Sequence, residues 1–182
     1  MRNIAIYKAT LDNEEIDQLK SVLQAKDDLS KVLEFEEKMV KYIGAKYAIA
    51  TATSTAALHL ALSSMRLKRG DKVLMSVNSF VNLPETVRHF DAEPIFVDIN
   101  LEDMNLDIEK FEETIIANKS KKLRAAIITF IGGLAPNLEK IYEIAKKHNI
   151  LIIEDCRAAL GTTYKGKKVG NLGADMTIFS TN

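Results

Sequence analysis

The sequence contains few of the residues that are typical of fibrous, disordered or disulfide-rich proteins. It has one cysteine, Cys156, so no disulfide can form within the chain, and its three prolines are scattered. There is no low-complexity tract, no repeat and no Gly-, Pro- or Ser-rich linker, which excludes collagen-like, disordered and disulfide-stapled classes. A signal peptide has a basic segment followed by an apolar one, and the first 15 residues do not show this pattern. Together with the lone cysteine, this predicts a cytoplasmic protein.

An excess of charge of either sign is also missing. The chain has 25 Lys and Arg against 25 Asp and Glu, a formal net charge of zero. A neutral chain has no overall field to attract phosphate backbones or anionic lipid, so we expect no nucleic-acid partner. The longest stretch without charge, residues 47–65, is interrupted repeatedly by Ser, Thr and His. A membrane span is therefore not expected there.

The remaining composition is that of a globular domain with a substantial core, at 182 residues, 47% hydrophobic and 27% charged. Apolar spacing predicts two opening helices, at 13–23 and 33–43. Short apolar runs then alternate with amphipathic segments, a rhythm typical of a parallel sheet covered by helices. The predicted strands are 47–51, 73–76, 94–97, 125–129, 151–154 and 176–180, and the predicted helices between them are 55–64, 80–89, 108–116 and 138–148.

Ligands of open α/β sheets bind beyond the carboxyl ends of the strands, and polar residues follow three of the predicted strands. The first group, Thr51–Thr55, lies between a strand and a helix. Unpaired N–H groups and small side chains at a helix N-terminus suit a phosphate, although Ser54 could equally just cap the helix. Neither a G-x-G-x-x-G nor a G-x-x-x-x-G-K-[ST] signature is present, so simple dinucleotide and P-loop sites are not predicted.

The second group is Glu154-Asp155, at the end of the most hydrophobic strand. A carboxylate there needs a partner, and Asp155 could hold a protonated ring nitrogen or a metal, or it could cap a following helix. The three histidines lack the spacing of a ligand set, so no metal site is expected. Cys156 is interpreted as a small buried residue rather than a nucleophile. The third group, around Ser180, is by itself typical of a turn.

The segments that join these places resemble one family. They are STAALHLAL (54–62), GDKVLM (70–75), FV (80–81), AEPIFVDI (92–99), IIEDCRAALGTTYKGKKVGNLG (152–173) and IFS (178–180). Their order and spacing resemble the DegT/DnrJ/EryC1/StrS sugar aminotransferases, which depend on pyridoxal 5'-phosphate (PLP) and have the aspartate aminotransferase fold. The resemblance implies an α/β, three-layer large domain with a mainly parallel seven-stranded sheet. It divides the chain into an N-terminal arm and helix, 1–30, and an incomplete PLP-binding large domain, 31–182, without the C-terminal small domain.

The resemblance also implies a role for individual residues. Asp155 matches the aspartate that pairs with the pyridinium nitrogen of PLP and keeps it protonated. Ser54 and Thr55 match the pair that binds the cofactor phosphate at a helix N-terminus, and Ser180 matches a serine that also reaches that phosphate. Phe80 matches the aromatic residue stacked on the ring. The cofactor-side position of Ala158 departs from the family, which commonly has Gln or His there.

A further departure concerns the lysine that forms the Schiff base with PLP. In the family it follows the serine matched by Ser180 within a few residues, and here the sequence ends at Asn182. Lys165, Lys167 and Lys168 belong to a predicted surface turn and do not match it. We therefore expect the chain to be a fragment of a longer enzyme.

The resemblance implies transfer of an amino group, with glutamate as the expected donor, to a nucleotide-linked keto-deoxysugar, in cell-surface polysaccharide or secondary-metabolite biosynthesis. The family also implies a homodimer with shared active sites. One alternative is a PLP-dependent sugar dehydratase of the same family, in which histidine replaces the lysine. A second is a truncated, non-catalytic homologue that acts as a binding module.

Overall fold

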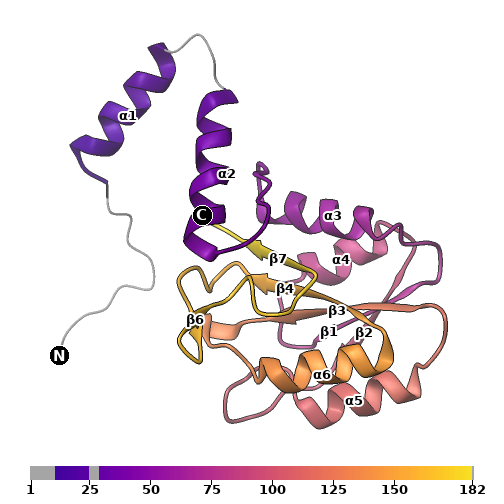
Figure 1. The fold of residues 1–182 in the computed structure, drawn as a ribbon. Helices are drawn as coiled ribbons and strands as arrows, with labels where there is room; N and C mark the ends of the chain where they lie inside the picture. The colour runs from indigo at the N-terminus through magenta and orange to yellow at the C-terminus, as the bar shows by residue number, and fades with distance from the viewer. Residues whose placement is uncertain (1–10, 25–28, 182) are drawn as a thin grey trace.

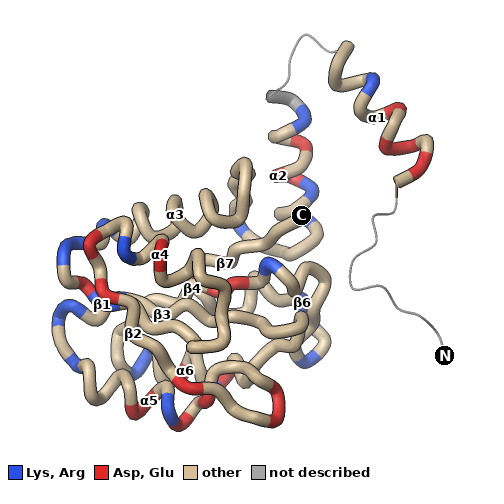
Figure 2. Tube along the Cα trace, turned by 180° about the vertical axis from the view of Figure 1, so that it is seen from behind, with Lys and Arg blue, Asp and Glu red and all other residues tan. Residues whose placement is uncertain are grey.

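The computed structural model describes residues 11–24 and 29–181. Two helices come first, α1 (Asn13–Gln24) and α2 (Leu29–Ile43), close to where the apolar spacing predicts them. Among the described residues, no helix combines the length and the apolar character that a bilayer span requires. Figure 2 shows basic and acidic residues interspersed over the domain, as a net charge of zero would suggest.

The central sheet has five parallel strands in the order β2-β1-β3-β4-β7. The strands are apolar at consecutive positions because both faces of the sheet are covered. Their bounds are β1 Lys72–Ser76, β2 Glu93–Val97, β3 Leu123–Thr129, β4 Leu151–Cys156 and β7 Met176–Phe179. The parallel α/β fold is thus confirmed, with five of the seven strands that the resemblance implied present among the described residues.

The predicted strand at 47–51 is wrong. The segment joins no ladder, and Tyr47 and Ile49 are largely exposed, so its apolar residues do not face the sheet. It is attached instead to α2, where the Ala50 N–H donates to Glu36 Oε1 at 2.7 Å. The short antiparallel hairpin of β5 (Thr163–Tyr164) and β6 (Lys167–Lys168) was not predicted; it forms the turn that carries the three lysines.

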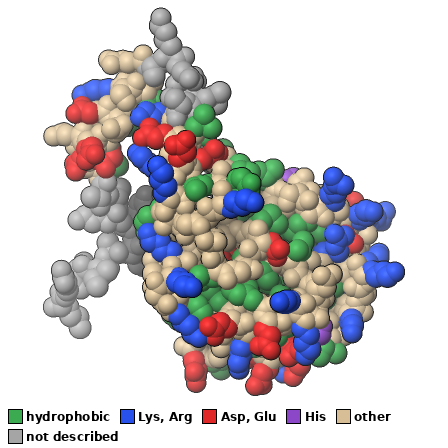
Figure 3. Space-filling view, viewed as in Figure 1, with side chains coloured by type: hydrophobic (Ala, Val, Ile, Leu, Met, Phe, Trp, Pro, Cys, Tyr) green, Lys and Arg blue, Asp and Glu red, His purple; other side chains and the backbone are tan. Residues whose placement is uncertain are grey.

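Four helices complete a three-layer arrangement around the sheet (Figure 1). On one face lie α3 (Ser54–Ser64) and α4 (Asn82–Arg88), and on the other α5 (Ile108–Ala117) and α6 (Leu138–His148). Alternate residues of each strand feed the two cores: Val73, Ile127 and Ile153 pack toward α3 and α4, whereas Leu74, Ile128 and Ile152 pack toward α5 and α6. In the view of Figure 3, hydrophobic side chains gather around the middle of the face and charged ones stand toward its rim.

The strand order reverses at β1. From β1 the chain moves through α4 to the edge strand β2, then crosses β1 through α5 to form β3 on its other side. The loops that leave β1 and β3 therefore part in opposite directions and open a crevice at the carboxyl ends of the strands. This point of the sheet is where a ligand site is expected.

Candidate active site

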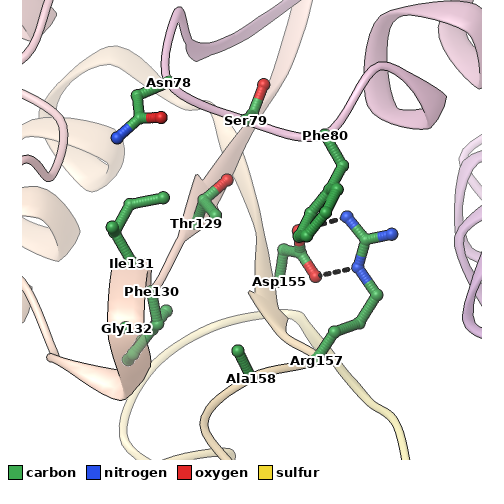
Figure 4. A pocket seen from close by; sticks show the side chains of 10 residues that line it. All are labelled: Asn78, Ser79, Phe80, Thr129, Phe130, Ile131, Gly132, Asp155, Arg157 and Ala158. Atoms are coloured by element: carbon green, nitrogen blue, oxygen red, sulfur yellow. Dashed lines mark hydrogen bonds and ion pairs between the residues drawn. The ribbon is translucent and has the colours of Figure 1, made fainter. Parts of the chain in front are cut away.

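A pocket of about 290 Å³ lies at this switch point (Figure 4). Three neighbouring strand ends line it: residues 78–80 follow β1, residues 129–132 include the end of β3, and Asp155, Arg157 and Ala158 come from the end of β4. Of the residues predicted from the sequence, Phe80, Asp155 and Ala158 meet here. The topology brings them together although they are far apart in the chain.

Asp155 forms the acidic wall of the pocket. The ladder places it beside Thr129 of β3 and Ile178 of β7, and only 3% of the residue is exposed. Its carboxylate accepts two hydrogen bonds from Arg157, Nε to Oδ1 at 2.6 Å and Nη2 to Oδ2 at 2.7 Å. The alternative that Asp155 caps a following helix is wrong, because turns rather than a helix follow β4.

Arg157 is a pocket residue to which sequence reasoning assigned no role. Its guanidinium carbon lies 5.1 Å from the centroid of the Phe80 ring, so the cation contacts both an aromatic ring and the Asp155 carboxylate. Phe80 itself is two-thirds exposed and stands at the mouth of the site. A basic residue two positions after the strand-end acid was the only signal available in the sequence.

The N-terminus of α3 holds the second predicted group. The capping residue is Thr53, whose Oγ1 accepts a hydrogen bond from the Ala56 N–H at 3.1 Å. The interpretation of Ser54 as the cap is therefore wrong. Thr55 is tied to the start of α4, because Asn82 Nδ2 donates to Thr55 Oγ1 at 2.8 Å. Ser54, Thr55 and Ser180 are not among the residues that line the pocket, although Ser180 directly follows β7 at the same edge of the sheet.

Two buried side-chain oxygens in the described part of the chain lack a hydrogen-bond partner, and both belong to this region. Thr129 Oγ1 lies at the pocket beside Asp155, and Asn82 Oδ1 belongs to the side chain that bonds Thr55. A buried acceptor without a partner is costly, and native proteins rarely leave one without a reason. The pocket edge and the α3 N-terminus are therefore the parts of the chain that offer unused hydrogen-bonding groups to a ligand.

Glu154, the neighbour of Asp155, faces the other side of the sheet. It is fully buried, where Tyr142 Oη donates to its Oε1 and Thr177 Oγ1 donates to its Oε2 at 2.9 Å. Cys156 is also fully buried on that face, and burial raises the pKa of its thiol, which confirms its interpretation as a packing residue. Neither residue takes part in the pocket.

Glu154 predicts a pH dependence of stability. Burial raises its pKa above the ordinary value of 4.5, so the folded state holds the proton more tightly than the unfolded state. The stability that protonated Glu154 contributes is fully present below pH 4.5 and is lost as the pH rises through the folded-state pKa. We expect Glu154→Gln to melt higher than the wild type as the pH is raised from about 5 to about 9, with a gap that narrows on acidification. Glu37→Gln, at an exposed position, is the control. A difference in melting temperature between Glu154→Gln and the wild type that does not change with pH would contradict the assignment.

The histidines form no metal centre in the described residues, where no group of three or more His, Cys, Asp and Glu side chains could hold an ion. His59 lies on α3 and is largely exposed. Its ring lies against Phe90, with centroids 4.6 Å apart.

With this geometry in place, the comparisons with known proteins are specific. The family model of the DegT/DnrJ/EryC1/StrS aminotransferases matches residues 9–182. This chain belongs to that family. The parallel α/β fold agrees with this membership, and Phe80, Asp155 and Ala158 meet at the carboxyl ends of its strands.

Several relatives are named as enzymes of nucleotide sugars. The UDP-4-amino-4,6-dideoxy-N-acetyl-beta-L-altrosamine transaminase of Campylobacter jejuni is 36% identical over 175 residues, which are 93% of this chain and 45% of that protein. A structure described as a sugar aminotransferase of Streptococcus pneumoniae in its PLP form superposes with a TM-score of 0.87, covering 100% of this chain and 49% of that one at 24% identity, and so supports the fold. GDP-4-keto-6-deoxymannose-3-dehydratase with bound GDP-perosamine gives a TM-score of 0.82 at 25% identity over 94% of this chain and 45% of that one.

The coverage of these matches is one-sided. The chain is matched almost throughout, but it spans less than half the length of the curated relatives it matches. The family and the fold therefore describe this chain directly. Activity, substrates and partners are properties of a whole protein, and for this chain they are proposals.

Proposed function

We propose that this chain forms the cofactor-binding part of a PLP-dependent aminotransferase that acts on a nucleotide-linked keto-deoxysugar. The observation that carries the proposal is Asp155: a buried carboxylate at the switch point of a parallel sheet, opposite an aromatic ring, in a protein of this family. A buried carboxylate requires a cationic partner, and a pyridinium nitrogen is such a partner. Arg157 supplies that charge in the structure described.

The residues present fit PLP. Asp155 would accept the N–H of the protonated ring, and Phe80 would lie against the ring face. The phosphate would lie at the N-terminus of α3, where Ser54 and Thr55 offer hydroxyls and the helix offers unpaired N–H groups, with Ser180 contributing from the end of β7. Ala158 would border the ring without a polar contact, and the unpartnered hydroxyl of Thr129 is available nearby.

When bound, PLP supplies an electron sink for the carbon from which a proton is removed. The task of this chain's residues is to hold that sink in a fixed state. Asp155 keeps the positive charge on the ring nitrogen, since a carboxylate favours the protonated form of a neighbouring base. Phe80 limits the tilt of the ring and excludes water from one face. None of the lysines of the described turn, Lys165, Lys167 or Lys168, lines the pocket, so the proton transfers are assigned to a group outside these residues.

We further propose glutamate as the amino donor and a homodimer as the working form. Apolar side chains of the N-terminal helices, Leu19, Leu23, Leu33 and Phe35, are exposed and would suit a contact with a second subunit. A second candidate is the PLP-dependent sugar dehydratase, favoured by the structural match to GDP-4-keto-6-deoxymannose-3-dehydratase. The non-catalytic binding module remains the alternative if neither reaction is found.

The experiment uses the protein encoded by the whole gene, purified with PLP and mixed with L-glutamate. We expect the absorbance of the PLP form to fall as 2-oxoglutarate appears in equal amount, and an inert mixture would overturn the enzyme proposal in favour of the module. GDP-4-keto-6-deoxymannose and glutamate with isotopically labelled nitrogen then separate the two reactions. Label retained in the sugar supports amination, whereas label released as ammonia supports dehydration.

A further inference from the structure

The side chain of Arg157 contacts the two residues that are proposed above to hold the cofactor ring, Asp155 and Phe80. Its guanidinium is planar and cationic, donates two hydrogen bonds to Asp155, and lies 5.1 Å from the centroid of Phe80. A pyridinium ring bound to the same two residues would present the same three features: a planar shape, a positive charge and an N–H directed at the carboxylate. Figure 4 shows the guanidinium beside the Phe80 ring, with both carboxylate oxygens of Asp155 bonded to it.

Two planar cations cannot occupy this space together. Both oxygens of Asp155 are already acceptors at 2.6 and 2.7 Å, and the carboxylate side chain is almost wholly buried, so a second donor has no direct approach. We propose that Arg157 is an internal competitor of the cofactor ring, which must leave Asp155 and Phe80 before the ring can bind. This inference rests on the proposed function, because it takes the pocket to be the PLP site.

The arrangement has a physical reason. Without a ligand, Asp155 would be a buried carboxylate with no counter-charge, and Arg157 neutralises it through a bidentate pair. Arg157 lies in a turn after β4. When its long side chain leaves Asp155, the charged guanidinium can be solvated by water. Arg157 thus stabilises the cofactor-free chain and at the same time weakens the apparent affinity for the cofactor, since only molecules with the pair open can bind.

The test measures binding rather than turnover. Pyridoxamine 5'-phosphate is the probe, because it has the ring and the phosphate but no aldehyde that could react with surface lysines. Its dissociation constant is measured by equilibrium dialysis on the protein encoded by the whole gene, as the wild type and as the Arg157→Ala and Arg157→Lys variants. Arg69→Ala is the matched control: it removes the same charge from an exposed position before β1, at the opposite end of the sheet.

We expect Arg157→Ala to bind the probe about tenfold more tightly than the wild type, the factor that follows if the pair is closed in about 90% of molecules. Arg157→Lys should fall between the two, because an ammonium group is a point charge that cannot form the paired hydrogen bonds of a guanidinium to both oxygens. Arg69→Ala should bind like the wild type. Circular dichroism and melting curves check the fold, and if Arg157→Ala does not fold, the Lys variant decides.

Equal affinity of the wild type and both Arg157 variants would overturn the competitor role and leave the cofactor site intact. Weaker binding by Arg157→Ala and Arg157→Lys would overturn it too, and would make Arg157 a ligand of the cofactor. If no form of the chain binds the probe at millimolar concentration, the cofactor site itself is refuted, and with it the inference drawn here.

Discussion

Asp155→Asn is expected to lower the rate of the half-reaction with glutamate about 100-fold or more while the fold is retained. Asparagine has nearly the same shape but no charge, so it cannot keep the ring nitrogen of PLP protonated, and the ring withdraws electrons less strongly. Asp155 is buried beside Thr129 and Ile178, and among the described residues that line the pocket no other carboxylate could take its place. The measurement is the loss of PLP absorbance after mixing the protein encoded by the whole gene with L-glutamate.

The matched control is Asp91→Asn. Asp91 is exposed in the turn before β2, at the far end of the sheet from the pocket, and its φ of 54° is one that asparagine tolerates. It should react at the wild-type rate. A near-normal rate for Asp155→Asn, with an unchanged circular dichroism spectrum, would refute the pyridinium role and leave Asp155 as the structural partner of Arg157.

Much of the fold could be predicted because its strands are apolar at consecutive positions. The runs around Ile127 and Ile153 indicate strands buried on both faces, and such strands are parallel and joined by helices. The meeting of Phe80 with Asp155 follows from the same rule, since the carboxyl ends of parallel strands share one edge. Local pattern and long-range topology agree at these positions, so the sequence is informative there.

Other features depend on contacts that no local pattern encodes. The segment 47–51 has the apolar character of a strand, but whether it pairs is decided by the space beside a sheet edge, and Ala50 bonds Glu36 of α2 instead. Thr53 and Ser54 are equally good caps by residue type, and the path of the chain selects Thr53. The rotamer that directs Arg157 toward Asp155 is determined by the surrounding pocket and not by the local sequence. The implied cofactor roles stay predictions for all six residues: Ser54, Thr55, Phe80, Asp155, Ala158 and Ser180.

Phe111→Ala is expected to have the largest effect on stability, a loss of about 3–5 kcal/mol in the free energy of unfolding. Phe111 lies on α5 with none of its surface exposed, in the core that joins α5 and α6 to the sheet. Its removal takes away apolar burial and leaves a cavity that helices fixed on a sheet fill only in part. Chemical denaturation of the chain, followed by circular dichroism, measures the change.

The control for this loss is Phe96→Ala on β2, where 51% of the residue is exposed, so the same truncation should cost about 1 kcal/mol or less. If both variants lose the same stability, the assignment of Phe111 to the core between the sheet and α5 is contradicted. A selective loss in Phe111→Ala would support it. The sheet that α5 and α6 cover on one face carries Asp155 and Thr129 toward the other, so the packing of Phe111 also bears on how rigidly the pocket is held.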